Sequence, residues 1–290
     1  MAESIIQCEH CTKTYKSKSG YKKHVRNKHE NPPVIQPLTS SSTDDASSAA
    51  GEVVIVSSQP PDAPYVFRYH DDVFLALQTK IEACEFKDNI RLLCNEQIVH
   101  WIIGHYEFLF HKRGLDQIQI KKEYNKKLKE LEDAWGNEMR NKYFAKEKTG
   151  QWTTLVGERI ASELYYLQGY SNKKPKRFEH FEPDLDCDQL IVEVKTQTYF
   201  TTGTAGEKIL GVPFKYAAVP RIYKKDLQII CIAGAEKLGR EQYKILPNTT
   251  AYCDMPCGQK SDPEQLALLE YWKTQKITFV GAADILKSIL

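Results

Sequence analysis

The chain has little net charge and no long apolar run. Its 290 residues contain 40 Lys and Arg against 38 Asp and Glu, which gives a formal net charge of only +2. Any contact with a polyanion must therefore come from local clusters of charge, not from the chain as a whole. No apolar segment approaches the length of a membrane span and no signal peptide is visible. We therefore expect an intracellular protein, in cytoplasm or nucleus, that does not enter a membrane.

Disulfide bonds are not expected either, although the chain has eight cysteines. Cys84, Cys94, Cys187 and Cys231 are scattered through apolar or mixed segments, where free thiols are ordinary. The Cys253–Cys257 pair has a spacing that suits a metal, but no nearby Cys or His pair completes such a site. This usage predicts a reducing compartment.

The first thirty residues contain a metal-ligand pattern. The four ligands are spaced as Cys-x2-Cys-x12-His-x4-His, and they are Cys8, Cys11, His24 and His29. Two thiolates and two imidazoles at this spacing fit a tetrahedral Zn²⁺, and a site closed by four protein ligands is structural. The segment resembles a C2H2 zinc finger, with Ile6, Tyr15 and Tyr21 as its small core and residues 18–29 as its helix.

The helix of this finger is a poor reader of bases. The usual finger geometry places Ser17, Gly20 and Lys23 at the base-facing positions, and a glycine cannot read a base edge. Seven Lys and Arg against three Glu in residues 1–30 favour unspecific phosphate contact instead. Binding of another protein is the alternative role.

Residues 31–62 are predicted to be a disordered linker. They contain seven Ser, five Pro and four acidic residues, with no Lys or Arg, and such a composition cannot form a packed core. The remaining residues are enough for one catalytic domain. We expect a finger at 1–30, a linker at 31–62, a helical subdomain at 63–150 and an α/β core at 151–290.

The most informative segment is EPDLDCDQLIVEVKTQTY. Its second half alternates like a β-strand, so Glu193 and Lys195 share one face while Val192 and Val194 point into the core. A tight hairpin would return Asp184 beside Glu193. Two carboxylates suit Mg²⁺, and an amine beside them can stabilise a phosphate, which together predict metal-assisted hydrolysis of a phosphodiester.

At these residues the chain resembles the PD-(D/E)XK nuclease superfamily. Pro183-Asp184 and Glu193-Val194-Lys195 match its signature, while Val156-Gly157-Glu158 upstream and the Gly/Thr-rich segment 201–209 downstream resemble its restriction-endonuclease branch. The resemblance implies a central mixed β-sheet flanked by helices. It also implies that Asp184, Glu193, Glu158 and the Val194 carbonyl hold Mg²⁺, and that Lys195 orients or deprotonates the attacking water.

Other interpretations of the same residues stay open. Asp186 and Asp188 compete with Asp184 for the first carboxylate, and both would serve equally well as turn residues. Glu193 and Lys195 would also make an ordinary surface ion pair. A glutamate at a helix start, as Glu158 is expected to be, is favoured by the helix dipole alone.

Local basic clusters adjoin the proposed site in the sequence, where they would contact phosphates or form an ordinary solvated surface. One consists of Lys173, Lys174, Lys176 and Arg177, immediately before the hairpin. Lys208 follows in the Gly/Thr-rich segment, where it would contact the DNA backbone or remain solvated. Residues 110–150 hold eleven Lys and Arg against seven Asp and Glu.

The expected elements follow from apolar periodicity. Residues 68–112 and 117–148 are predicted to be helical, the latter with a stripe formed by Ile120, Tyr124, Leu128, Leu131 and Trp135. A helix beginning near Val156, a hairpin at 181–199, a helix at 206–219 interrupted by Pro213, and strands at 227–233 and 277–280 complete the core.

The resemblance implies a Mg²⁺-dependent, sequence-specific endonuclease of double-stranded DNA, similar to type II restriction enzymes, with the finger as an accessory module. Cleavage of both strands would suit a homodimer. The finger is typical of eukaryotes and their viruses, so its union with a bacterial-style nuclease suggests a large DNA virus or a transferred gene as the source. The alternatives are a non-catalytic DNA-binding protein on a nuclease-like scaffold and a structure-selective repair or junction nuclease.

Overall fold

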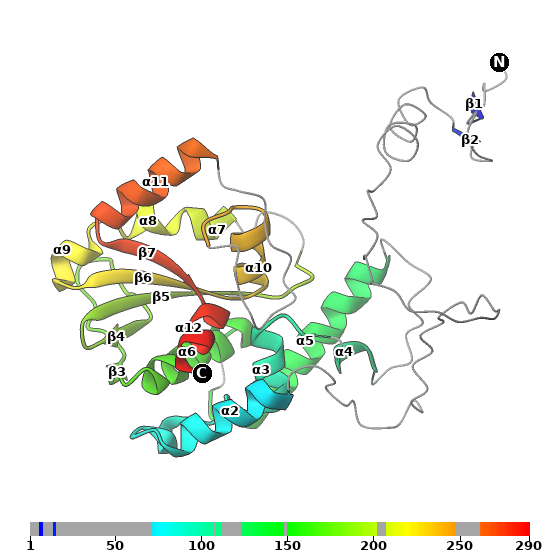
Figure 1. Cartoon of the computed structure of the whole chain (residues 1–290), viewed down its shortest axis with the longest axis horizontal. Coiled ribbons are helices and arrows are strands. Elements are labelled where there is room, and N and C mark those ends of the chain that lie inside the picture. The colour runs from blue at the N-terminus through cyan, green and yellow to red at the C-terminus, as the bar shows by residue number, and fades with distance from the viewer. Residues whose placement is uncertain are drawn as a thin grey trace, which may run out of the picture. The chain divides into compact units, whose positions relative to one another are not determined.

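The fold is described from a computed structural model of the chain (Figure 1). The structure describes residues 6–7, 14–15, 71–106, 108–111, 123–147, 150–201, 207–246 and 262–290. Two compact units are present, Met1–Ser57 and Ser58–Leu290. Each is described by itself.

The N-terminal unit contributes one small hairpin. Strands β1 (Ile6–Gln7) and β2 (Thr14–Tyr15) pair antiparallel, with Ile6 opposite Tyr15. A hairpin at this position agrees with the first half of the expected finger. The predicted zinc ligands Cys8, Cys11, His24 and His29, and the predicted DNA contacts Ser17 and Lys23, lie outside the described residues, so the zinc site stays a prediction.

The second unit is built on a five-stranded mixed sheet with strand order β3-β4-β5-β6-β7. The strands are β3 (Asn172–Lys173), β4 (Leu185–Cys187), β5 (Leu190–Gln197), β6 (Asp226–Ala233) and β7 (Ile277–Gly281). The first two pairings are antiparallel and the last two are parallel. The predicted mixed α/β class is therefore confirmed, as are the expected strands at 227–233 and 277–280.

Helices cover both faces of this sheet. Helices α6 (Trp152–Leu167) and α12 (Ala282–Ile289) pack on one face, with Val192, Val194, Ile230 and Ile232 beneath them. Helices α8 (Val212–Lys215), α9 (Val219–Tyr223) and α11 (Pro263–Thr274) pack on the other. Because β6 is covered on both sides, its second half, Ile229–Ala233, is continuous in apolar residues. Helices α7 (Glu207–Leu210) and α10 (Gly234–Glu241) lie near the carboxyl ends of β5 and β6 (Figure 1).

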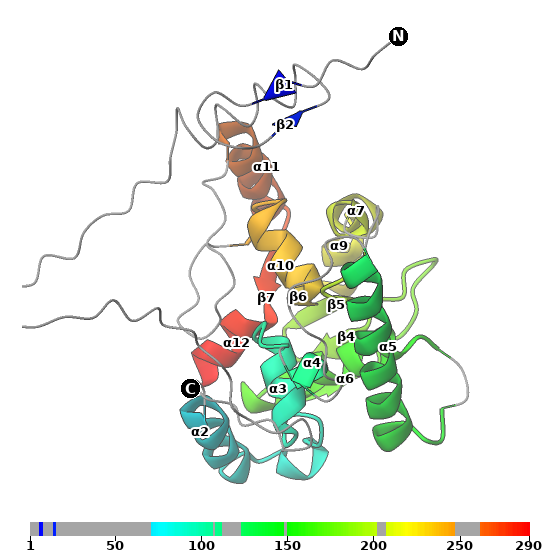
Figure 2. The ribbon, with the colours of Figure 1, turned by 90° about the vertical axis from the view of Figure 1, so that its right-hand side faces the viewer.

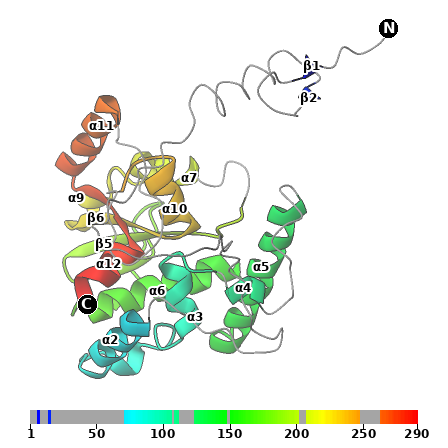
Figure 3. The same ribbon diagram turned by 45° about the vertical axis from the view of Figure 1, so that its right-hand side comes forward.

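The helices described between residues 71 and 143 gather on the α6 side of the sheet (Figures 2 and 3). They are α2 (Asp71–Glu82), the short 3₁₀ helix η2 (Lys87–Asn89), α3 (Glu96–Ile102), α4 (Phe108–His111) and α5 (Glu123–Tyr143). The indole rings of Trp101 and Trp135 pack 5.5 Å apart, and those of Trp101 and Trp152 5.6 Å apart. These residues belong to the same apolar core as one face of the sheet, so the helical region and the sheet share a single core.

Some expected helices are divided differently. The predicted helical stretch 68–112 is several short helices. The segment 206–219 contains α7 and α8, and Pro213 lies in the first turn of α8, where its missing N–H costs no hydrogen bond. Helix α6 begins at Trp152, earlier than expected. Within the described part of the chain, no helix combines the length and apolar character needed to cross a bilayer.

Candidate active site

Asp184 is fixed at the point where β4 stops pairing with β5. The antiparallel register places Leu185 opposite Val192, so one residue further along, Asp184 lies across from Glu193. The backbone N–H of Asp184 donates to the Val192 carbonyl at 3.0 Å, and its Oδ2 accepts from the Val194 N–H at 2.7 Å. The side chain thus replaces the missing strand partner, and this bond holds the carboxylate at the sheet edge.

Glu193 and Lys195 lie on one face of β5, as their spacing predicts. Lys195 Nζ is 2.6 Å from Glu193 Oε1 and donates to the Val194 carbonyl at 3.0 Å. The ion pair that the alternative interpretation expected is therefore present, but the Glu193 side chain is only 5% exposed, so the pair is largely buried and not on the surface. Its second oxygen, Oε2, is buried and accepts no hydrogen bond from any residue that the structure describes. Such an atom costs free energy unless a ligand satisfies it.

Glu158 approaches the hairpin from α6, on which it follows Gly157. A Cβ at position 157 would overlap the Thr196 hydroxyl and come within 2.7 Å of the Thr196 Cβ. Glycine therefore permits the helix to lie close enough to β5 for Glu158 to reach Asp184. Burial, followed by the Asp184 charge, raises the pKa of Glu158 to about 7. Since α6 begins at Trp152, Glu158 is beyond the first turn, and a helix-dipole role does not explain its position.

These side chains line one cavity of about 220 Å³. Its walls are Thr154, Glu158, Asp184, Glu193, Val194, Lys195 and Thr196. The structure therefore brings together every core residue that the sequence proposed for catalysis, at the edge where β5 extends beyond β4.

The competing aspartates are held elsewhere. Asp186 forms an ion pair with Lys225, whose Nζ also donates to the Cys187 carbonyl at 3.3 Å. Asp188 accepts from the Ser171 hydroxyl at 2.7 Å and from its N–H at 3.2 Å. Both carboxylates stabilise the hairpin and its neighbour β3, and neither lines the cavity.

Tyr216 and Lys215 are neighbours of the site that sequence reasoning missed. Tyr216 is 3% exposed, and its pKa is raised by burial and then by the charges of Glu193 and Asp184. Lys215 donates to the Tyr216 hydroxyl at 3.1 Å. Burial and the Asp184 charge raise the pKa of Glu193, whereas Lys195 and Lys215 oppose that rise. The two residues follow β5 by about twenty positions, and no local pattern marked them.

The predicted DNA-contact lysines are exposed. The exposed residues are Lys173, Lys174, Lys176 and Arg177. The charge of Lys174 lowers the pKa of Glu158 by less than burial and Asp184 raise it. Lys208, on α7, and Gln197 line a second, larger cavity that also contains Lys195. Contact of these side chains with DNA stays a prediction.

The donor set fits a divalent cation in part. Among the described residues, no three Asp, Glu, His or Cys side chains already converge as a metal-binding group. The Val194 carbonyl is occupied by Lys195. Mg²⁺, however, is usually held by one or two carboxylates, with waters and substrate phosphates completing its shell. The unpartnered Glu193 Oε2 and the like-charged Asp184 and Glu158 are oxygens of the kind this ion prefers.

We compared the chain with models of known families, with curated proteins and with solved structures, and none of the three comparisons produced a match.

Proposed function

We propose that this chain is a Mg²⁺-dependent endonuclease that hydrolyses phosphodiester bonds in double-stranded DNA. The observation that carries the proposal is the cavity at the end of the β4–β5 hairpin, where Asp184, Glu193 and Lys195 meet Glu158 of α6. Three carboxylates beside one ammonium suit metal-assisted attack on a phosphate better than they suit structural pairing.

Asp184 and Glu193 would hold the ion, with Glu158 as a third oxygen donor. When bound, Mg²⁺ supplies the Lewis acid that activates water and offsets charge on the phosphate. Burial, with the Asp184 charge as a second cause, raises the pKa of Glu158 to about 7. The ion would oppose this rise, since a nearby cation favours the ionised carboxylates.

Lys195 would act on the reacting phosphate. Its Nζ is held between Glu193 Oε1 at 2.6 Å and the Val194 carbonyl at 3.0 Å, so its direction is fixed before substrate enters. An ammonium aimed into the cavity would orient the attacking water and stabilise negative charge that develops on the phosphate oxygens. Tyr216 would position Glu193 from behind, because its buried hydroxyl lies close to that carboxylate.

The finer parts of the proposal concern specificity and assembly. Similarity to restriction-endonuclease motifs favours sequence-specific cleavage on a core of that type. A Zn²⁺-bound finger would add affinity, and a homodimer would present one active site to each strand of a two-fold symmetric sequence. The non-catalytic scaffold is disfavoured by the complete Asp184, Glu193 and Lys195 set. A structure-selective nuclease would use the same chemistry on a different substrate.

The deciding experiment is incubation of the full chain with plasmid DNA and Mg²⁺, followed by sequencing of the fragment ends. A defined sequence at the ends supports restriction-type specificity, while ends that follow junctions or flaps support structure selectivity. Binding without cleavage, in protein that contains Asp184, Glu193 and Lys195 and is saturated with Mg²⁺, would reject the proposed enzyme in favour of the scaffold.

A further inference from the structure

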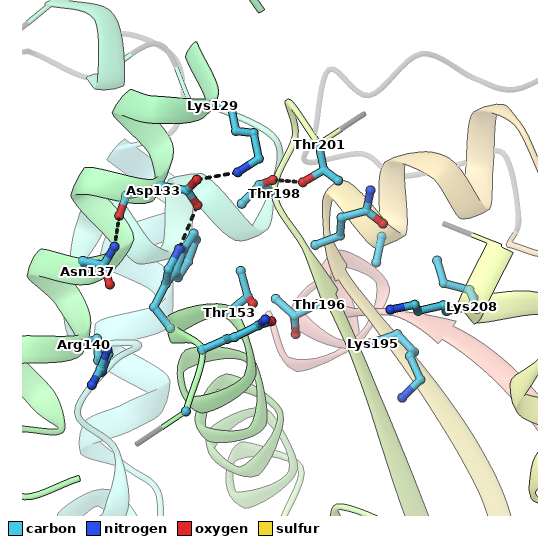
Figure 4. Close-up of a pocket in the computed structure, with 16 residues that line it drawn as sticks. Lys129, Asp133, Asn137, Arg140, Thr153, Lys195, Thr196, Thr198, Thr201 and Lys208 are labelled. Carbon is cyan, nitrogen blue, oxygen red and sulfur yellow. Dashed lines mark hydrogen bonds and ion pairs between the residues drawn. The ribbon is translucent and has the colours of Figure 1, made fainter. Parts of the chain in front are cut away.

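A larger cavity of about 560 Å³ lies next to the candidate active site (Figure 4). It is enclosed by α5, the first residues of α6, the end of β5 and α7. Among the described residues, its charged lining consists of Lys129, Arg140, Lys195 and Lys208 against one carboxylate, Asp133. The cavity therefore has a positive excess, in a chain whose formal net charge is only +2.

Asp133 is already engaged by the protein. Its Oδ2 is 2.5 Å from Lys129 Nζ, its Oδ1 accepts from the Trp152 indole N–H at 3.0 Å, and its carbonyl accepts from Asn137 at 2.7 Å. Figure 4 shows this network along the α5 wall, with Lys195 and Lys208 on the opposite side. The network orients Lys129 and Asn137 at the wall and leaves little of the Asp133 charge to oppose a bound anion.

The two remaining cations are not neutralised by neighbours. Neither Arg140 nor Lys208 forms an ion pair with any residue in the described part of the chain. Arg140 lies two turns beyond Asp133 on α5 and Lys208 lies on α7, so the positive charge faces the cavity from two sides. An anion entering between them would meet two charges that no carboxylate screens.

The start of α6 adds to the same field. Gln151, Trp152 and Thr153 line the cavity. The first turn of this helix holds no acidic residue, and its N-cap side chain makes no capping hydrogen bond. The Thr154 N–H of this sixteen-residue helix already donates to the Gln151 carbonyl at 3.1 Å. No described residue accepts from the Trp152 and Thr153 N–H groups, which therefore suit an anion.

This cavity is adjacent to the candidate active site. Lys195 and Thr196 line both cavities, and the buried Thr196 Oγ1 forms no hydrogen bond with any described residue. A chain of phosphates that places one member beside Glu193 would therefore bring the next into the positive cavity.

We propose that this cavity is a phosphate-backbone subsite, which holds the DNA strand beside the phosphate being cut through Lys129 and Arg140 of α5 and Lys208 of α7. The choice of DNA as ligand rests on the proposed function. Of the described residues in the lining, Trp152 alone is aromatic, and it is 6% exposed and bonded to Asp133. Since unstacked bases need open aromatic faces, the subsite suits the backbone of a duplex and not splayed single-stranded bases.

The test measures binding without cleavage. Full-length Arg140→Gln, Lys129→Gln and the double variant would be titrated, by fluorescence anisotropy, against a labelled 30-bp duplex in Ca²⁺ over a range of salt. Loss of one phosphate contact makes the negative slope of log K against log salt shallower by about 1, which corresponds to about eightfold weaker binding at 0.1 M salt. The double variant should lose more than either single variant.

Arg221→Gln is the charge-matched control. Arg221 lines a third cavity with Lys224 and Lys276, at the opposite ends of the parallel strands, where β6 and β7 begin. Its binding should equal that of the wild type. The subsite would be overturned if the α5 variants had the same Kd and the same salt slope as the wild type. It would also be overturned if Arg221→Gln lost as much affinity for the duplex as they do. A third contrary result is that the α5 variants bind the duplex normally and lose affinity only for a single strand of the same sequence.

This binding test is independent of the chemistry. If the wild type binds duplex DNA but never cuts it, the proposed enzyme fails while the α5 variants still report on the subsite. If the wild type cuts DNA and the α5 variants bind normally, the subsite fails and the enzyme stands.

Discussion

Two clusters of buried charge in the core domain have opposite designs. In the first, Arg240 of α10 bonds Glu236 at 2.6 Å and Asp284 of α12 at 2.7 Å, and the second Glu236 oxygen accepts from the Ala283 N–H at 3.1 Å. In the second, Asp184, Glu193 and Glu158 line one cavity, Lys195 pairs with Glu193, and the Glu193 Oε2 accepts no hydrogen bond from any described residue. The comparison separates a cluster that binds elements together from one that leaves its charges available to a ligand.

The two clusters also differ in how tightly they are packed. A Cβ on Gly281 would overlap Glu236 and lie 2.6 Å from the Arg240 guanidinium, so the first cluster is closed. The hairpin cluster faces a cavity of about 220 Å³. Functional sites commonly keep such electrostatic strain, and removing it tends to raise stability while abolishing activity.

The largest expected effect is on cleavage. Asp184→Asn, Glu193→Gln and Lys195→Met should each lower the cleavage rate at least about 10³-fold, since each removes a group that acts on the reacting phosphate or its metal. Thermal stability should be unchanged or higher. The matched control is Asp186→Asn, two residues from Asp184 but paired with Lys225, which should cut DNA normally. An inactive Asp186 variant beside an active Asp184 variant would transfer the catalytic role.

The closed cluster should respond in stability instead. Arg240→Met leaves Glu236 and Asp284 without their partner, and breaking a buried pair costs about 3–5 kcal/mol of unfolding free energy. Replacing Glu236 and Asp284 as well with apolar residues should recover most of this loss. Chemical denaturation measures the stability, while cleavage per folded molecule should stay near the wild-type value. If the Arg240→Met variant were as stable as the wild type but had lost its activity, the Arg240 cluster would serve catalysis and not stability.

Local pattern explains which of these clusters the sequence revealed. Asp184 and Glu193 lie on one hairpin, so strand alternation and a short turn were enough to bring them together. Glu158 needed the resemblance, and its close approach through Gly157 needed the structure. Tyr216, and the Arg240–Asp284 pair, join elements that are far apart in sequence. No periodicity encodes such contacts, because packing of the sheet against its helices decides them.

The same reasoning holds for the fold. The apolar runs of β6 and β7 were predictable, because strands covered on both faces have continuous hydrophobic sequences. The short β3, and helices α10, α11 and α12, were not predicted. Strand β3 has two residues and depends on its pairing with β4, which no local signal reports.

A third buried carboxylate tests whether burial alone makes a carboxyl group pH-sensitive. Glu132 is fully buried and accepts from the Trp101 indole at 2.7 Å and from the Tyr199 N–H at 3.0 Å. Burial raises its pKa from 4.5 to about 7. The folded state therefore holds this proton more tightly than the unfolded chain, so the associated stability is complete below pH 4.5 and lost as pH rises through 7.

Glu132→Gln should remove that pH dependence. Between pH 4.5 and pH 7, ionisation of Glu132 should lower the unfolding free energy of the wild type by about 3 kcal/mol. The fall in unfolding free energy over the same pH range should be about 3 kcal/mol smaller in the variant. Glutamine keeps an oxygen for both donors, so the fold is retained. Denaturation at several pH values measures the difference; parallel curves for the two proteins would show that Glu132 is ionised throughout.

A smaller effect is expected at the contact between α6 and β5. Gly157→Ala places a methyl group against Thr196, and such overpacking costs about 1–3 kcal/mol. Because the helix must then move away from β5, Glu158 should also move, and cleavage should fall further than stability requires. Gly169→Ala is the comparison at the other end of the helix, where no atom lies within 4 Å of the added group but φ is +86°, so it should cost stability alone. Equal cleavage by both variants, once corrected for the folded fraction, would remove Glu158 from the site.

The smallest effect on catalysis should come from the N-terminal unit. Its predicted ligands Cys8, Cys11, His24 and His29 should bind one Zn²⁺ per chain, and Cys11→Ser should release it.

The predicted linker 31–62 tethers the finger without fixing its register, so the finger should add affinity through phosphates. Deleting residues 1–60 should weaken DNA binding and flatten its salt dependence. The cut sequence should stay the same, because specificity would reside in the core. A relaxed or altered cut sequence after deletion, seen by sequencing the fragment ends, would show instead that the finger reads bases, and Ser17 and Lys23 would then be the side chains to exchange first.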